Sequence, residues 1–209
     1  MQIEEQVQGI DLVLQTNEEV FSPTAVDRGT KAMLSFVTFS SEDKVLDLGC
    51  GCGVVGILAA KQIGPERVVM CDISENAVEL SKKNAEANGV GTVTIRQSDG
   101  LKEITENGFT LILSNPPYHT DFAVAKEFIE DGFKKLVLGG KMIMVTKRLD
   151  WYRNKLSSVF GGVTVKEQDG YYVFLAEKRG NRKPKKEKKK EQVMSKKLQR
   201  KYGKKINHQ

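Results

Sequence analysis

One short segment of the chain carries the groups needed to hold a planar amine. The segment Asn115-Pro116-Pro117-Tyr118 follows a β-rich run over residues 109–113. The two prolines fix φ and donate no backbone hydrogen bond, so the peptide is rigid and its carbonyls point outward. The Asn115 Oδ1 and the Pro116 carbonyl can accept both hydrogens of one NH₂ group, which draws the nitrogen lone pair out of conjugation, and Tyr118 can stack on the group that carries the amine. The chemistry indicated is positioning and polarisation of an exocyclic amine, without an obligatory general base.

A second segment, rich in glycine, runs from Asp47 to Gly56, and Asp72 ends the next expected strand. Glycine lets the backbone approach a ligand closely, and open α/β sheets bind ligands beyond the carboxyl ends of their strands. Asp72 can there accept both hydroxyls of a ribose. The spacing Gly51-x-Gly53-x-x-Gly56 is also a dinucleotide fingerprint, so an NAD-linked oxidoreductase competes for this turn. Asp47 disfavours it, because a carboxylate before the glycines repels a pyrophosphate but suits an ammonium group.

These two segments need a sheet whose strand ends lie side by side. From residue 44 onward, short β-rich runs alternate with helical stretches, which predicts a mostly parallel sheet with helices on both faces. The expected strands are 44–48, 67–71, 92–96, 109–113 and 141–146, and the expected helices are 54–63, 74–88, 121–138 and 150–159. Runs at 163–165 and 171–176, joined by a link that ends in Asp169-Gly170, predict a C-terminal antiparallel hairpin.

The chain divides into three parts. Residues 1–43 are predicted to be an N-terminal extension, with extended segments around 12–15 and 20–21 and a lid helix over 24–37 packed on the body. Residues 44–177 are the α/β core, and residues 178–209 are a basic tail that is predicted to be flexible. Asp27 and Arg28 either order the lid helix or form a surface ion pair.

Taken together, the motifs resemble a known family. The pattern Asp47-x-Gly49-x-Gly51-x-Gly53, then Asp72, then Asn115 to Tyr118 is similar to that of class I S-adenosylmethionine-dependent methyltransferases that act on a planar nitrogen, over roughly residues 20–177. Two further segments, with His119, are most similar to the small-domain group, which includes ribosomal RNA guanine-N2 methyltransferases: Phe21-Ser22 and Asp27-Arg28-Gly29-Thr30. The resemblance implies a Rossmann-like fold with a seven-stranded sheet.

The resemblance also implies a role for each motif. The cofactor is S-adenosyl-L-methionine and the product S-adenosyl-L-homocysteine. Asp47 and the glycine turn hold the methionine part, Asp72 the ribose and Asp99 the adenine amine. The implied cofactor-binding residues are Asp47, Gly49, Cys50, Gly51, Gly53, Asp72, Ile73 and Asp99, and the implied catalytic residues are Asn115, Pro116, Pro117 and Tyr118.

The acceptor stays open. Guanine N2 or adenine N6 in ribosomal or other structured RNA is favoured, and protein glutamine N5 is the alternative, since the same tetrapeptide serves all three. Related ribosomal enzymes often carry a second methyltransferase-like domain, and glutamine enzymes an N-terminal helical domain, for which 43 residues offer little room. A non-catalytic RNA-binding module is disfavoured by the intact Asp47, Asp72 and Asn115.

The charge distribution indicates the partner. The net charge is +6, but residues 178–209 hold 15 Lys/Arg against two acids, a net +13, whereas residues 1–177 hold 18 basic and 25 acidic residues, a net −7. A basic tail releases counterions when it neutralises phosphates, so RNA is the expected partner and the tail its electrostatic anchor. Trp151 and Tyr152 either stack on RNA or pack against the body.

Other classes are disfavoured. The apolar runs are far shorter than the roughly 18–20 residues that span a bilayer, and the acidic N-terminus is unlike a secretory signal. A cytoplasmic location and no membrane partner are therefore expected. Cys50, Cys52 and Cys71 match neither a disulfide framework nor paired zinc ligands, so no metal is expected. The sequence does not indicate an oligomeric state.

Overall fold

The computed structural model of the chain describes residues 2–16, 25–116 and 122–180. Its strands are β1 (Gln2–Val7), β2 (Ile10–Gln15), β3 (Val45–Leu48), β4 (Val68–Asp72), β5 (Thr94–Gln97), β6 (Phe109–Ser114), β7 (Leu136–Thr146), β8 (Thr164–Gln168) and β9 (Tyr171–Glu177). Its helices are α1 (Arg28–Leu34), α2 (Val54–Ile63), the short 3₁₀ helix η1 (Pro65–Arg67), α3 (Glu75–Ala87), α4 (Phe122–Lys135) and α5 (Leu149–Phe160). None of these helices is long and apolar enough to cross a membrane.

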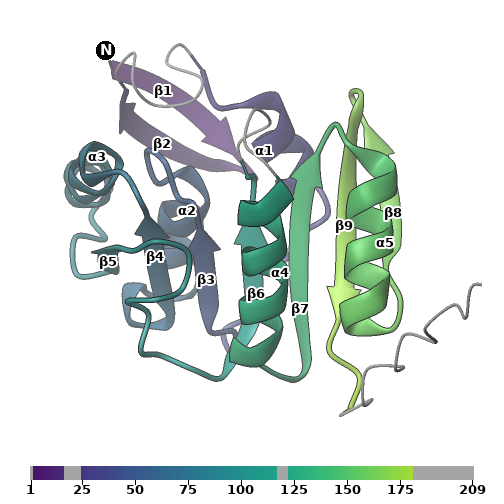
Figure 1. Cartoon of the computed structure of the whole chain (residues 1–209). Coiled ribbons are helices and arrows are strands. Elements are labelled where there is room, and N and C mark those ends of the chain that lie inside the picture. The colour runs from purple at the N-terminus through teal and green to yellow at the C-terminus, as the bar shows by residue number, and fades with distance from the viewer. Residues whose placement is uncertain (1, 17–24, 117–121, 181–209) are drawn as a thin grey trace, which may run out of the picture.

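Seven strands form one sheet in the order β5-β4-β3-β6-β7-β9-β8 (Figure 1). The first five run parallel, and β9 is antiparallel to both β7 and β8, which confirms the predicted mostly parallel sheet with a C-terminal hairpin. The chain leaves β3 toward β4 on one side, and the later strand β6 pairs with β3 on the other. The strand order therefore reverses between β3 and β6, and a crevice at such a switch point is where open α/β sheets bind ligands.

Side chains alternate between the two faces of the sheet. In β3, Val45 joins the apolar cluster under α1 and α2, whereas Leu46 and Leu48 join the cluster under α4 and α5. Helices α4 and α5 lie in front of the sheet in Figure 1. By this alternation Asp47 shares the face of Val45 and lies under α2, so a carboxylate is placed where the strand would otherwise carry an apolar residue.

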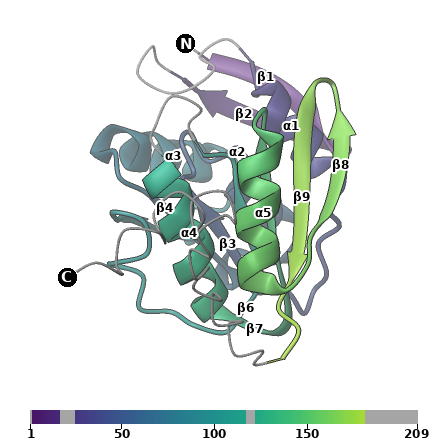
Figure 2. The same cartoon turned by 45° about the vertical axis from the view of Figure 1, so that its right-hand side comes forward.

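The N-terminal segment forms a two-stranded hairpin, and β1 was not predicted from the sequence. Gln8 and Gly9 both have positive φ, of 52° and 77°, which is the requirement of a two-residue type I′ turn. The same geometry at Asp169 and Gly170 closes the predicted β8–β9 hairpin. Figures 1 and 2 show β1, β2 and α1 together above the edge at which the parallel strands end.

Two helix boundaries differ from the prediction. The lid helix expected over 24–37 is the shorter α1, which begins after Asp27, and the expected segment at 20–21 lies outside the described residues. Helix α4 ends at Lys135 rather than residue 138, because Leu136 already pairs with Phe109 in the sheet. The pairing shifts register before Leu111 meets Lys141, so a bulge precedes the strand that was expected from residue 141.

Candidate active site

The glycine turn between β3 and α2 has a shape that only glycine fits easily. Its first three glycines have positive φ: Gly49 (77°), Gly51 (56°) and Gly53 (93°). A Cβ on Gly56 would overlap the side chain of Met70, so the first turn of α2 lies directly against β4. The turn is anchored to the end of β4, where the backbone N–H groups of Gly49 and Cys50 both donate to the Cys71 carbonyl at 2.9 Å.

Two aspartates flank this turn, as the sequence predicted. The Asp47 Oδ2 accepts the Gly56 N–H at 2.8 Å, at the first turn of α2. The Asp72 Oδ2 accepts the Gly51 N–H at 2.9 Å, and its Oδ1 accepts the Ser74 N–H at 3.0 Å. Both carboxylates therefore hold the backbone of the turn and its neighbour, and they bring negative charge to the ends of adjacent strands.

Asp47 is almost fully buried, and this changes its acidity. Burial raises the pKa of the Asp47 carboxyl from 3.8 to about 7, the Gly56 N–H opposes the rise, and the charge of Asp72 adds to it. A carboxyl with this pKa is half protonated near neutral pH, and a cationic ligand group beside it favours the ionised form. This suits the ammonium group of an amino-acid moiety.

Two polar residues of α3 hold the outer side of the turn and were missed in the sequence. The Ser81 hydroxyl donates to the Gly51 carbonyl at 2.8 Å. The Asn84 Nδ2 donates to the Cys52 carbonyl at 2.8 Å and to the Gln15 carbonyl at 2.9 Å, which ties the turn to the end of β2. The available signal was that Ser81 and Asn84 interrupt the apolar stripe of an amphipathic helix, where polar side chains need a partner.

Asn115 lies directly beyond the end of β6, at the switch point. The Ser114 hydroxyl before it donates to the Leu48 carbonyl at 2.8 Å, which joins the ends of β6 and β3. The Asn115 Nδ2 donates to Asp27 Oδ2 at 2.8 Å and to Thr30 Oγ1 at 3.0 Å. Asp27 is the N-cap of α1, and no ion pair links it to Arg28 within the described chain. Of the two roles considered for Asp27, ordering the lid helix is therefore the one that its contacts match.

A pocket of about 80 Å³ brings the predicted segments together. It is lined by Ile3, Ala25, Val26, Asp27, Thr30, Asp47, Gly49, Cys50, Gly51, Cys52, Val54, Val55 and Asn115. Asp47, Gly49, Cys50 and Gly51 from the predicted cofactor set thus face the same space as Asn115. The hairpin and α1 form the opposite wall through Ile3, Asp27 and Thr30.

Other predicted residues lie elsewhere. Ile73, just after Asp72, is 65% exposed and presents an apolar surface beyond the end of β4. Asp99 follows β5, is more than half exposed and forms an ion pair with Lys102. Pro116 is buried, whereas Pro117 and Tyr118 lie outside the described residues. The roles of these residues remain predictions.

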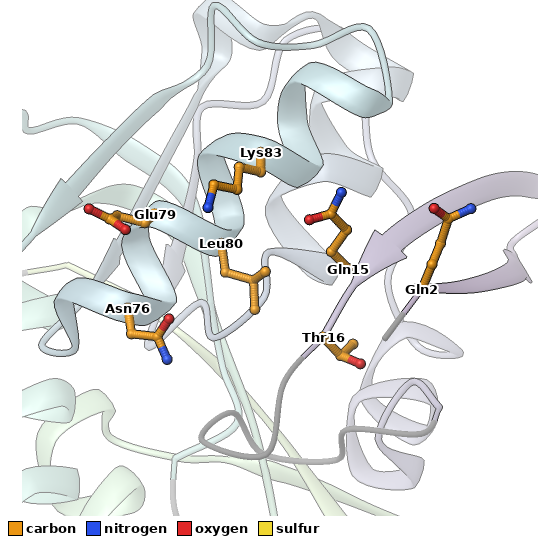
Figure 3. A pocket seen from close by; sticks show the side chains of 7 residues that line it. All are labelled: Gln2, Gln15, Thr16, Asn76, Glu79, Leu80 and Lys83. Atoms are coloured by element: carbon orange, nitrogen blue, oxygen red, sulfur yellow. The ribbon is translucent and has the colours of Figure 1, made fainter.

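A larger pocket, of about 380 Å³, lies between the hairpin and α3 (Figure 3). Gln15 and Thr16 line one side, and Glu79, Leu80 and Lys83 of α3 line the other. None of the predicted site residues lines this pocket. The residues with recognisable chemistry gather at the smaller pocket instead.

The three cysteines are free thiols. Burial raises the pKa of Cys52 to about 11 and of Cys71 to about 12, and it raises the pKa of Cys50 well above its usual value. They are therefore protonated at neutral pH, whereas zinc and nucleophilic chemistry need the thiolate. Within the described residues, no group of three His, Cys, Asp or Glu could hold a metal.

The fold and the glycine turn define a class I S-adenosylmethionine-dependent methyltransferase. The residues present fit that cofactor. The buried Asp47 suits its ammonium group and the glycines admit close backbone contact at the same pocket. The same buried carboxyl disfavours the alternative, an NAD-linked oxidoreductase, because it would repel the pyrophosphate of NAD at this turn.

Known proteins agree with this class. The family model described as "Methyltransferase small domain" matches residues 11–176, so the chain belongs to the methyltransferase small domain family. Ribosomal RNA small subunit methyltransferase C of Cronobacter sakazakii is 34% identical over 78% of this chain and 48% of that protein. The uncharacterized protein YbxB of Bacillus subtilis is 33% identical over 80% of this chain and 87% of that protein.

The fold is also found among solved structures. A 16S rRNA N2 methyltransferase of T. thermophilus, solved with AdoMet and guanosine, superposes with a TM-score of 0.71 at 24% identity, over 86% of this chain and 50% of that one. The chain thus spans about half the length of several of the relatives it matches. The likeness covers the part that contains the glycine turn and Asn115.

Proposed function

We propose that this protein transfers a methyl group from S-adenosylmethionine to an exocyclic amine of a nucleobase in ribosomal RNA, with guanine N2 the first candidate and adenine N6 the second. The observation that carries the proposal is the placement of Asn115, whose amide lies against the same pocket as Asp47 and the glycine turn. The names of the ribosomal RNA relatives support the acceptor, since they share the segment that holds both groups.

The residues of the chain have distinct tasks in this reaction. The Asn115 Oδ1 and the Pro116 carbonyl accept the two N–H groups of the target, which fixes the direction of the nitrogen lone pair. When bound, the cofactor would supply an electrophilic methyl group to the nitrogen lone pair, with the electrons of the broken S–C bond staying on sulfur and one N–H proton passing to water. Tyr118 stacks on the base. A base inside a helix must first be flipped out to reach Asn115.

RNA binding also draws on the tail. Residues 178–209 carry a net charge of +13, opposite in sign to the rest of the chain. Each phosphate that such a tail neutralises releases counterions and adds affinity without reading sequence. A cytoplasmic location, where ribosomal RNA is available, belongs to the same proposal.

The acceptor is tested with the full chain and tritiated S-adenosylmethionine. Unmodified ribosomal RNA, small ribosomal subunits and total protein are offered in parallel, and the labelled products are hydrolysed and separated. We expect label in RNA, recovered as N2-methylguanosine. Label in protein as N5-methylglutamine would overturn the RNA acceptor, and label in N6-methyladenosine would replace guanine by adenine. The variant Asn115→Ala, assayed in the same way, serves as the negative control for methyl transfer.

A further inference from the structure

A carboxylate from the N-terminal part of the chain holds the amide of Asn115. The Asp27 Oδ2 accepts the Thr30 N–H at 2.9 Å as the N-cap of α1, and it also accepts the Asn115 Nδ2 at 2.8 Å. The hydroxyl of Thr30 contacts the same Nδ2 at 3.0 Å. One oxygen atom therefore orders the start of a helix and a side chain 88 positions later.

We propose that Asp27 is a positioning residue for methyl transfer: it fixes the Asn115 amide so that Oδ1, and not Nδ2, faces the target amine. An amide has two ends of similar size, and only the carbonyl end can accept a hydrogen bond from an amine. A carboxylate can only accept, so Asp27 selects the orientation in which the NH₂ end of Asn115 points to it. The inference rests on the proposed role of Asn115.

The charge of Asp27 has a second consequence. A hydrogen bond from the Asn115 NH₂ group to a carboxylate is charge-assisted, and it pulls electron density toward the amide oxygen. A more negative Oδ1 is a better acceptor for the target N–H, whose nitrogen becomes positive as the new bond forms. Asp27 thus acts through Asn115 and does not itself touch the substrate.

The hairpin makes this arrangement rigid. The Glu5 Oε2 of β1 accepts the Val26 N–H at 2.9 Å, and Glu5 also forms an ion pair with Lys31 of α1. At the other end of α1, the Gln8 Nε2 donates to the carbonyls of Leu34 and Val37 at 2.7 and 2.8 Å. Both ends of α1 are therefore tied to one hairpin, which fixes Asp27 relative to Asn115.

The test compares Asp27→Asn and Asp27→Ala with the control Asp43→Asn. Asp43 also accepts a backbone N–H, from Ser40 at 2.8 Å, and a hydroxyl, from Thr110 at 2.7 Å, but it precedes β3 at the far edge of the sheet. We expect kcat on RNA to fall about 100-fold in Asp27→Ala and about 10-fold in Asp27→Asn, which keeps the N-cap acceptor. The KM for RNA and the Kd for S-adenosylhomocysteine should change less than about threefold, and Asp43→Asn should match the wild type.

A spectroscopic measurement separates this inference from the proposed function. The side-chain NH₂ signal of Asn115, assigned with Asn115→Ala, should shift and exchange faster with solvent in Asp27→Ala but not in Asp43→Asn. If the wild type methylates RNA and Asp27→Ala retains full kcat with an unshifted amide signal, the inference is wrong. If the wild type methylates no RNA, the proposed function fails, while the amide signal still reports on the contact.

A separate observation concerns the far side of Asn115, at the carboxyl end of β7. Lys147 and Arg148 follow this strand, and both are exposed. The Arg148 Cζ lies 4.9 Å from the ring centroid of Phe122, and the Lys147 Nζ lies 4.9 Å from that of Tyr171. Across the described ranges, neither cation forms an ion pair with a carboxylate.

Aromatic contacts fix Arg148 in place. Phe122 stacks on Trp151 with ring centroids 4.4 Å apart, Trp151 meets the edge of Tyr152 at 5.1 Å, and Tyr152 packs on the buried Phe174. These contacting rings run from the buried Phe174 to the exposed guanidinium of Arg148. Trp151 therefore packs against the body, and Arg148 lies over the ring of Phe122, on which Trp151 stacks.

We infer that Lys147 and Arg148 bind phosphates of the RNA strand that flanks the target base. They lie beside β6, whose end carries Asn115, on the side away from β4 and Asp72. Residues 1–177 are acidic as a whole, yet they place two cations without carboxylate partners at the edge where the substrate is proposed to bind. Such a pair of cations is suited to a polyanionic ligand. The inference extends the proposed RNA acceptor.

The variant Lys147→Ala with Arg148→Ala is compared with Lys82→Ala combined with Lys83→Ala, which removes the same charge from exposed positions on α3. We expect the first pair to weaken RNA binding and to reduce the slope of log K against log salt by about 1.4–1.8, as for two phosphates. The Kd for S-adenosylhomocysteine should not change. An unchanged slope, or an equal loss in the α3 variant, would contradict the inference, whereas absence of any RNA binding by the wild type would count against the RNA acceptor itself.

Discussion

Replacing Asn115 with alanine is expected to lower the turnover number for methyl transfer by about 10²–10³-fold, the range found when one preorganised hydrogen-bonding group is removed from developing charge. The reason is that alanine has no side-chain oxygen to accept the target N–H, which is the role proposed for Asn115 Oδ1. The substitution leaves intact the residues of this pocket that are predicted to bind the cofactor, Asp47 and the glycine turn. The Kd for S-adenosylhomocysteine, measured by calorimetry, should therefore stay within about threefold of the wild type.

The matched control is Asn107→Ala. Asn107 is exposed at the opposite end of β6, where its backbone carbonyl accepts the Lys44 Nζ at 2.8 Å. It should leave turnover and binding unchanged. The midpoint of thermal unfolding must be recorded, because Asn115→Ala also removes the contacts to Asp27 and Thr30, at a cost of about 1–3 kcal/mol. Full residual turnover in Asn115→Ala would remove Asn115 from the mechanism, and lost cofactor binding would move it to the cofactor site.

Much of the fold could be predicted because its signals are local. A helix was expected from residue 74, and the Ser74 hydroxyl accepts the Ala77 N–H at 3.3 Å as the N-cap of α3. Asp169-Gly170 predicted a hairpin, and both residues have the positive φ that such a turn needs. The alternation of strands and helices then leaves few topologies, since parallel strands need right-handed crossovers.

The elements that were missed lack such signals. Strand β1 has the sequence QIEEQV, in which only Val7 is buried, so its pattern resembles a polar loop. Its pairing with β2 and its packing beside α1 supply the stabilisation that the strand alone does not show. The Gln8-Gly9 pair was the one local indication of a turn.

The candidate site also has one part that local sequence signals could predict and another that they could not. Asp47 and the glycines were found from spacing, because the turn is continuous in sequence. The contact of Asp27 with Asn115 joins positions 88 residues apart, and it exists only because α1 is placed over the ends of the strands. Ser81 and Asn84 could be recognised as buried polar residues, but the carbonyls that they bind depend on how α3 packs on the turn.

The second large effect is expected from Asp47, as a dependence of stability on pH. The folded-state pKa of about 7 lies above the unfolded value of 3.8, so the folded protein keeps a proton that the unfolded chain has lost over this interval. The stability from this group is thus fully present below about pH 4 and falls as pH rises to about 7. A difference of about three pKa units, at about 1.36 kcal/mol each, sets an upper value of roughly 4 kcal/mol for this loss of stability.

Asp47→Asn should remove this loss, because the amide is neutral and its Oδ1 can still accept the Gly56 N–H. We expect the variant without cofactor to have a higher free energy of unfolding at pH 8 than the wild type, by up to roughly 4 kcal/mol, and the same value near pH 4. Urea unfolding at both pH values measures it. Asp43→Asn, which removes a carboxylate far from the pocket, is the control. Equal stability of Asp47→Asn and wild type at pH 8 would contradict the burial of an ionised carboxyl.

Cofactor binding should have the opposite dependence on pH. If the ammonium group of S-adenosylhomocysteine lies beside Asp47, as proposed, it stabilises the ionised carboxyl, so binding below pH 7 must release the proton that Asp47 carries in the free protein. The wild-type Kd should therefore weaken by roughly 20-fold between pH 7.5 and 5.5, with close to one proton released at pH 6 in calorimetry with buffers of different ionisation enthalpy. Asp47→Asn should bind more weakly at every pH and release no proton. The neighbouring Asp72 and the protonated thiol of Cys50 are unchanged in this variant, so a proton release that persists in it would assign the titration to another group. In the proposed binding mode the buried carboxyl exchanges a proton for the cofactor's ammonium group, so the same group that lowers stability at high pH raises the affinity for the cofactor.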